Sequence, residues 1–231
     1  MISWFGRGYV LRARTQPALL VALPFIAFLL YMLGEPKVAI VVPALSVLGV
    51  IAFSAEIVRG RGRRLEERLV KEWGGLPTTK MLRSSEGASA VRRRRELETF
   101  TGLTLPTERE EELDPAAADR EYVAVVKVAI ARIGRGTLLQ SENIGYGFRR
   151  NMLAWKPVEF WIVAVAALLN GAVGLWLHFP MATYGVWAVQ AVLLVCWIAF
   201  VNAAWVRDQA EAYATEFFTE VSAAVASNAK V

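Results

Sequence analysis

Uncharged apolar runs are the strongest pattern along this chain. The longest covers 47 residues, from Phe160 to Val206, and contains no Asp, Glu, Lys or Arg. A membrane core about 30 Å thick takes roughly 20 helical residues per crossing, so this run is long enough for two crossings. We predict a transmembrane hairpin with spans at about 159–178 and 184–206 and a turn near His178 and Pro180.

Two shorter runs near the N-terminus predict another hairpin. Residues 15–34 are uncharged, residues 34–37 (Gly-Glu-Pro-Lys) have the composition of a turn, and residues 38–55 are uncharged again. The spans are expected at about 16–34 and 38–56. The first run is longer than a signal-peptide core and lacks a clear small-x-small cleavage site, so we expect it to be retained.

The residues between the hairpins have helical patterns. Asp114-Pro115 is a strong helix start, and the apolar positions that follow lie on one helical face until Gly134: Ala118, Tyr122, Val125, Val126, Ala129 and Ile133. Residues 91–100 predict a second helix that ends at Gly102. Residues 138–157 have no clear period and are expected to be irregular. Beyond Val206 the spacing predicts a helix that continues out of the last span.

The distribution of charge predicts the topology. Of the 26 Lys and Arg residues, twenty lie between Arg59 and Lys156, and the net charge is +5. Such an excess on one side of the spans marks the cytoplasmic side. We therefore expect an all-α integral membrane protein with cytoplasmic termini: a first hairpin segment (1–58), a mainly helical cytosolic domain (59–157), a second hairpin (158–206) and a cytosolic helical tail (207–231).

Composition and motifs argue against enzymatic chemistry. With 55% hydrophobic residues the chain is too apolar for a soluble globule. Its single cysteine, Cys196, excludes an intrachain disulfide, and a structural zinc site would need more Cys or His. His178 falls in the predicted external turn, and no phosphate loop or His-Glu-x-x-His motif is present. We expect no catalytic residue, metal site or cofactor.

The most basic stretch of the chain is Arg92, Arg93, Arg94 and Arg95. These arginines could contact anionic lipid, a partner protein, or a nucleotide or nucleic acid. No aromatic side chains are interleaved with them, which disfavours a nucleic-acid platform. The acidic residues 108–112 offer a complementary surface, within one chain or between copies.

Polar residues within the predicted spans are few. They suggest helix packing or, once several copies assemble, the lining of a pore, and we group them with two neighbouring glycines: Ser46, Asn170, Gly171, Gly174, Gln190 and Asn202. No predicted span has a charged residue at its centre, which argues against a pump or an ion-coupled carrier.

The segment before the second hairpin has an unusual sequence. Two glycines around a tyrosine, followed by Phe and paired arginines, predict a fixed turn, which we interpret as an elbow that couples the cytosolic domain to the third span: Tyr146, Gly147, Phe148, Arg149, Arg150 and Asn151. A plain connector back to the membrane is the alternative.

Three segments carry a resemblance to a known group of proteins. Residues 72–79 (Glu-Trp-Gly-Gly-Leu-Pro-Thr-Thr), the Asp114–Tyr122 region and residues 146–151 (Tyr-Gly-Phe-Arg-Arg-Asn) resemble uncharacterised bacterial four-span membrane proteins associated with phage-defence loci. The resemblance covers about a hundred residues of the cytosolic insert, and the Asp114 motif has one extra alanine. It implies an inner-membrane component of a defence system, with no catalytic residues to transfer.

Three functions are compatible with this sequence. The first is a non-enzymatic, homo-oligomeric sensor-effector whose cytosolic domain receives a soluble partner or a ligand and drives membrane perturbation or pore opening. The second is a membrane scaffold that recruits a soluble protein. The third is a small-molecule transporter, which the absence of charge in mid-span disfavours.

Overall fold

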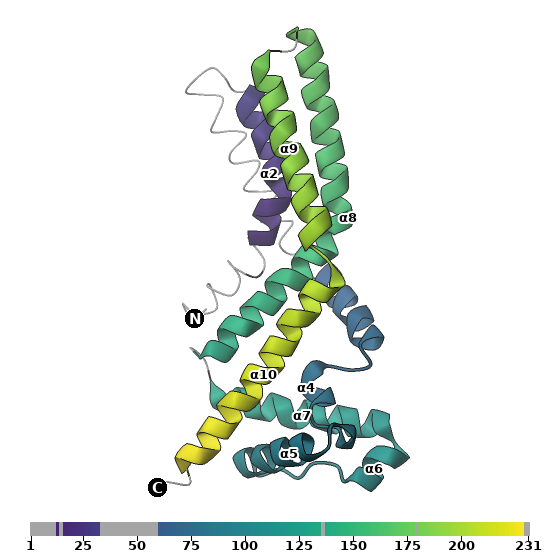
Figure 1. The fold of residues 1–231 in the computed structure, drawn as a ribbon, viewed down its shortest axis with the longest axis vertical. Helices are drawn as coiled ribbons and strands as arrows, with labels where there is room; N and C mark the ends of the chain where they lie inside the picture. Colours follow the sequence, from purple (N-terminus) through teal and green to yellow (C-terminus); the bar gives the residue numbers. More distant parts are fainter. Residues whose placement is uncertain (1–12, 14–15, 33–59, 135–136, 179, 229–231) are drawn as a thin grey trace. The chain divides into compact units, whose positions relative to one another are not determined.

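The computed structural model describes residues 13, 16–32, 60–134, 137–178 and 180–228, and these residues form helices and connecting turns without any strand (Figure 1). The predicted all-helical class is therefore confirmed for the described residues. The chain divides into two compact units. Unit 1 contains residues 1–66 and 147–206, and unit 2 contains residues 67–146 and 207–231. These limits differ from the expected divisions, because residues 207–231 belong with the insert.

Unit 1 holds the longest apolar helices. Helix α8 (Leu138–Trp176), from Gly147 onward, lies beside α9 (Met181–Phe200), and α2 (Gln16–Met32) packs against α9 (Figure 1). Both α8 and α9 are long and apolar enough to cross a membrane. Of the four predicted spans, the first overlaps α2, a 17-residue helix that is not one of these two candidate spans, and the second, at 38–56, lies outside the described residues.

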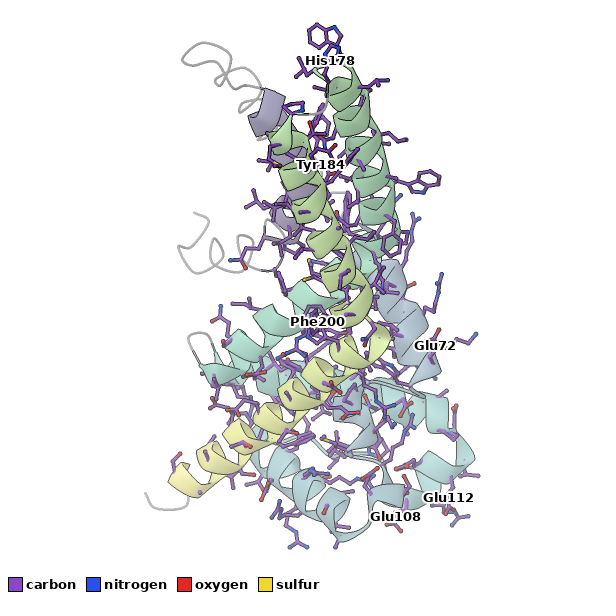
Figure 2. The ribbon with its side chains drawn as sticks, turned by 45° about the horizontal axis from the view of Figure 1, so that its top comes forward. Glu72, Glu108, Glu112, His178, Tyr184 and Phe200 are labelled. Atoms are coloured by element: carbon purple, nitrogen blue, oxygen red, sulfur yellow. The ribbon has the colours of Figure 1, made fainter. Side chains whose placement is uncertain are left out.

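A short turn joins α8 to α9. His178 adopts a φ of 60°, a left-handed conformation that is uncommon for a residue other than glycine, and its N–H donates to the Leu175 carbonyl at 3.3 Å. Pro180 then precedes α9 in an extended conformation, and its carbonyl accepts from the Thr183 N–H at 2.9 Å. Figure 2 shows His178 at this turn and Phe200 at the other end of α9.

The prediction that residues 138–157 are irregular is wrong. They belong to the 39-residue helix α8, and residues 146–151, predicted as a bent elbow, are helical throughout. Gly145 does not form a turn. It allows the Gln209 side chain to pack closely against α8, since a Cβ atom at position 145 would lie 3.0 Å from Nε2 of Gln209. Burial of Leu139, Met152 and Trp155 on α8 outweighs the low helix propensity of the glycines.

The expectation that one helix continues from the last span into the tail is also wrong. Helix α9 ends at Phe200, and α10 (Ala203–Asn228) begins after a break at Val201 and Asn202. The Asn202 side chain accepts a hydrogen bond from the Trp205 N–H at 2.9 Å, which is the geometry of a helix N-cap. Because the residues on both sides of the break are apolar, the sequence pattern does not indicate that Asn202 begins a new helix.

Unit 2 packs apolar side chains of three helices into one core. Helices α5 (Ala88–Thr101) and α7 (Pro115–Ile133) and the part of α10 from Arg207 onward supply most of it, beside the shorter α4 (Pro77–Lys80), η2 (Ser84–Glu86) and α6 (Glu108–Leu113). The buried core residues are Leu82, Leu97, Leu105, Ala118, Tyr122, Val125, Val126, Ala129, Leu139, Phe217, Phe218 and Val221.

The predicted limits of α7 are confirmed. The Asp114 carboxylate accepts from the Ala117 N–H at 2.9 Å, Pro115 occupies the first helical position, and Gly134, with a φ of 84°, follows the last residue. The predicted apolar face of this helix is the face that the core buries. Local signals therefore suffice where capping and periodicity agree.

Candidate functional site

Helices α8 and α9 expose most of their apolar side chains. Within the most hydrophobic 18 residues of each, 28% are buried in α8 and 17% in α9. The large apolar residues that are more than half exposed include Trp161, Leu168, Leu175, Trp176, Val192, Val195, Ile198 and Phe200. A core helix of a soluble protein buries such residues, so this pair needs an apolar surrounding or a partner surface.

The buried positions of the same two helices form a narrow stripe, which we call the buried seam. On α8 they recur every three or four residues: Met152, Trp155, Glu159, Val163, Ala166, Asn170 and Gly174. On α9 they recur every seven residues: Thr183, Gln190 and Trp197. These intervals place the buried side chains of each helix on one face, as in a helix–helix seam.

Four members of the buried seam are polar, and three of them hold polar atoms without a hydrogen-bond partner. Glu159, Asn170 and Thr183 are 0% exposed and Gln190 is 2% exposed. Asn170 Nδ2 donates to the Thr183 carbonyl at 3.0 Å. Both carboxyl oxygens of Glu159, Asn170 Oδ1 and both amide atoms of Gln190 have no partner in the described structure. Each unpartnered buried group costs about 1–3 kcal/mol, so stability does not explain them.

Glu159 is the functional candidate that the sequence interpretation missed. It stands immediately before the uncharged run and is not among the predicted site residues. Its position gave a usable signal, because Glu159 lies four residues after Trp155 and four before Val163, on the apolar face of a helix. Trp155 lies in residues 138–157, which the sequence pattern predicts as irregular, so the helical spacing from Trp155 to Glu159 and Val163 does not enter the prediction.

The two basic residues Arg149 and Lys156 of α8 contact the break between α9 and α10. Lys156 Nζ donates to the Val201 carbonyl at 2.7 Å, and Arg149 donates to the Trp205 carbonyl at 2.9 Å. The Arg149 guanidinium also lies 5.0 Å from the centroid of the Trp205 ring. The Val201 carbonyl follows the end of α9, where an interrupted helix leaves carbonyl groups without a helical partner, whereas the Trp205 carbonyl lies in the first turn of α10.

The other residues of the predicted elbow make contacts within unit 1. Phe148 packs edge-on against Trp205 with 6.2 Å between ring centroids. Arg150 forms an ion pair with Glu66 at 2.5 Å, and Asn151 Nδ2 donates to the Ala13 carbonyl at 2.6 Å. Tyr146 is the last residue of that segment in unit 2, and Gly147 is the first in unit 1. Their proposed coupling role stays a prediction, without a bend in the backbone.

The arginine run divides into two pairs with different surroundings. Arg93 and Arg94 are half-buried, whereas Arg92 and Arg95 are exposed. Arg93 donates to the Met81 carbonyl at 3.3 Å and lies 5.5 Å from the Phe218 ring centroid. Arg94 donates to the Tyr122 hydroxyl at 2.6 Å and to the Pro106 carbonyl.

One acidic residue of the 108–112 stretch joins this network. Glu111 lies 3.8 Å from Arg94, accepts from the Tyr122 hydroxyl at 2.7 Å and accepts from the Ser84 N–H at 3.2 Å. Burial and the hydrogen bond to Glu111 raise the pKa of Tyr122 well above its ordinary value. The predicted pairing of the two charged stretches is therefore present in one chain, while Glu108 and Glu112 are exposed (Figure 2).

The remaining predicted packing residues have separate outcomes. Gly171 lets α8 and α9 approach closely, since a Cβ atom there would lie 3.2 Å from Cζ2 of Trp187. Gly174 is buried, in agreement with a packing role. Asn202 lies outside the buried seam, because it is exposed and caps α10, and its pore-lining role in an assembly stays a prediction. Ser46 lies outside the described residues.

Neither metal-binding residues nor similarity to known proteins assigns a function to this chain. Among the described residues no group of three or more His, Cys, Asp or Glu side chains is placed to hold a metal ion. Comparison with models of protein families, with curated proteins and with solved structures finds no match to this chain. Function must therefore be argued from the buried seam and from the polar network of unit 2.

Proposed function

We propose that the chain is a multi-pass protein of the bacterial inner membrane with four spans and both termini in the cytoplasm. Two candidate spans, the apolar helix α2 and the concentration of Lys and Arg between residues 59 and 156 support this topology. The fourth span is best taken as Met181–Phe200, because the helix is interrupted after Phe200.

The proposed activity is non-enzymatic ion permeation that unit 2 controls. The supporting observation is the buried seam, in which Glu159, Asn170 and Gln190 keep polar atoms unpaired inside an otherwise apolar helix pair. Intramembrane ionisable residues are costly and mark ion or proton pathways in membrane proteins. Three polar side chains cannot line an aqueous channel alone, so the conducting form in this proposal is a homo-oligomer.

Unit 2 is the receiving part in this proposal. Its exposed charges, including Arg92, Arg95, Glu108 and Glu112, give a soluble protein or ligand a surface to bind. We propose a role for this sensor-effector in anti-phage defence, where loss of the membrane gradient would stop an infected cell, and the resemblance noted in the insert supports it. That assignment rests on the resemblance alone.

Reconstitution tests the proposal. The full chain is purified in detergent, inserted into liposomes loaded with potassium chloride, and potassium efflux is followed with a selective electrode. Efflux above that of protein-free liposomes is expected for the wild type. Glu159→Leu and Gln190→Leu should reduce it, because both remove polar groups of the buried seam.

Val192→Leu is the matched control, since Val192 is 63% exposed on the same helix as Gln190. Its efflux should equal that of the wild type. Liposomes that stay tight at every protein-to-lipid ratio would overturn ion permeation and favour the scaffold function, for which the exposed charges of unit 2 suffice. Saturable uptake of a solute without ion efflux would favour a transporter.

A further inference from the structure

A groove of about 360 Å³ lies within unit 2 between α5 and α10. One wall is formed by Arg92, Arg93 and Glu96 of α5. The volume falls within the range of small-molecule sites, about 300–1,000 Å³. The groove is separate from the buried seam, since every lining residue belongs to unit 2.

The α5 wall supplies donors. The Arg92 side chain is 73% exposed, and its distance to the Glu96 carboxylate is 3.9 Å, longer than a hydrogen bond. Its guanidinium can therefore turn toward an anion in the groove. Arg93 is held in place by Met81 and Phe218, which fixes its planar guanidinium against the apolar floor. A planar guanidinium stacks well on a flat ring.

The α10 wall supplies acceptors. The Thr215 hydroxyl donates to the Glu211 carbonyl at 2.9 Å, and the Thr219 hydroxyl donates to the Thr215 carbonyl at 3.0 Å. The Ser222 hydroxyl donates to the Glu96 carboxylate. Since all three protons are used inside unit 2, these oxygens offer lone pairs to a ligand. A fitting ligand thus needs N–H or O–H donors on this side.

We propose that this groove binds a nucleotide. The phosphate pairs with Arg92, the base lies on the surface formed by Arg93 and Phe218, and the exocyclic amine donates to Thr219 and Ser222. Inorganic phosphate alone would use the arginines and leave the acceptor wall unpaired. The inference rests on the proposed function only in that the nucleotide would be the ligand that unit 2 receives.

Isothermal titration calorimetry on the full chain in detergent tests this site, with AMP as the probe. AMP should bind at least about tenfold more tightly than ribose 5-phosphate, which lacks the base, or adenosine, which lacks the phosphate. Arg92→Ala should weaken AMP binding by about tenfold or more, because it removes a charge-assisted pair with phosphate. Ser222→Ala should weaken AMP binding more than ribose 5-phosphate binding.

Arg95→Ala is the matched control, since Arg95 is exposed on the same helix and does not line the groove. Its AMP affinity should equal that of the wild type. No heat with AMP, equal affinity for AMP and ribose 5-phosphate, or an equal loss in Arg95→Ala would each overturn the proposal. Binding is measured without ion flux, so tight liposomes from a protein that binds AMP would refute permeation alone.

Discussion

The two units bury opposite kinds of chemistry. The buried seam of unit 1 contains Glu159 and Gln190 with unpartnered polar atoms, and its outward surface is apolar. Unit 2 buries Leu97 and Phe217, and its buried Tyr122 hydroxyl donates to one side chain and accepts from another. Unit 1 therefore buries a few polar side chains among apolar ones beneath an apolar surface, whereas unit 2 exposes charged residues such as Arg92 and Glu108.

This difference shows which force holds each unit. In unit 2, removal of apolar area from water stabilises the fold, and polar groups are tolerated inside because they are paired. In the proposed membrane setting that driving force is absent between the helices of unit 1, and close packing takes its place, as where the Trp187 ring lies against Gly171. Stability therefore does not require the polar members of the buried seam, which favours a functional reason for them.

The largest expected effect is a loss of stability in unit 2 on Phe217→Ala. Phe217 is 0% exposed and packs edge-on against Phe218 at 5.0 Å. Truncating such a buried ring to alanine in a hydrophobic core costs about 3–5 kcal/mol of the free energy of unfolding. Thermal unfolding in detergent, followed by far-ultraviolet circular dichroism, and hydrogen exchange of the α7 amides would both report this loss.

Leu175→Ala is the counterpart in unit 1, since Leu175 is 69% exposed on α8. Its effect should stay within about 0.5 kcal/mol, as for an ordinary surface position. A large loss from Leu175→Ala would show that a protein surface, and no lipid, covers the outer face of α8. The contrast between the two units would then fail.

The second prediction is a gain of stability in unit 1 in place of a loss. Glu159→Leu should stabilise the protein by about 1–3 kcal/mol, because it removes a buried carboxyl group that has no hydrogen-bond partner among the described residues. The same variant should lose potassium efflux, so stability and activity would move in opposite directions. Tryptophan fluorescence during thermal unfolding is a suitable readout, since Trp155 and Trp197 belong to the same seam.

Arg94→Leu tests the same rule in unit 2. Arg94 is bound to Tyr122 and Pro106 and lies near Glu111, so its removal leaves paired groups without a partner. The melting temperature should fall. If Glu159→Leu lowered stability as Arg94→Leu does, Glu159 would have a structural partner, and the functional interpretation of the seam would be lost.

The sequence predicts best where local and tertiary signals agree. The start at Asp114-Pro115, the apolar face ending near Ile133 and the stop at Gly134 all appear in α7. The apolar run after Phe160 likewise appears as α8 and α9. These features depend on capping, periodicity and hydropathy, which neighbouring residues determine among themselves.

The features that the sequence concealed depend on contacts distant along the chain. Gly145 and Gly147 look like turn residues, and only the packing of Gln209 beside Gly145 explains why a glycine stands in that helix. The break after Phe200 is set by one Asn202 cap and by Lys156, 45 residues earlier. Glu159 stands at the start of the predicted span 159–178, and its place on the buried face follows only when the helix also includes residues 138–157, which the prediction treats as irregular.

The smallest expected effect concerns the paired polar interior of unit 2 at high pH. Because the folded-state pKa of Tyr122 is raised, the folded protein keeps the hydroxyl proton while the unfolded chain releases it above about pH 10. Rising pH then favours the unfolded state, so the free energy of unfolding should fall by up to about 1.4 kcal/mol per pH unit for this group. Below about pH 10 this contribution is fully present.

Tyr122→Phe should remove that share of the slope and cost about 1 kcal/mol at neutral pH, since Arg94 and Glu111 lose a shared partner. Tyr213→Phe is the matched control, because burial also raises the pKa of Tyr213. Each variant should remove only the part of the pH dependence of stability that its own hydroxyl contributes. Melting temperatures between pH 8 and about pH 11 would measure both. An unchanged slope in Tyr122→Phe would mean that the hydroxyl is not held in a paired interior, and polar pairing would no longer separate unit 2 from the buried seam.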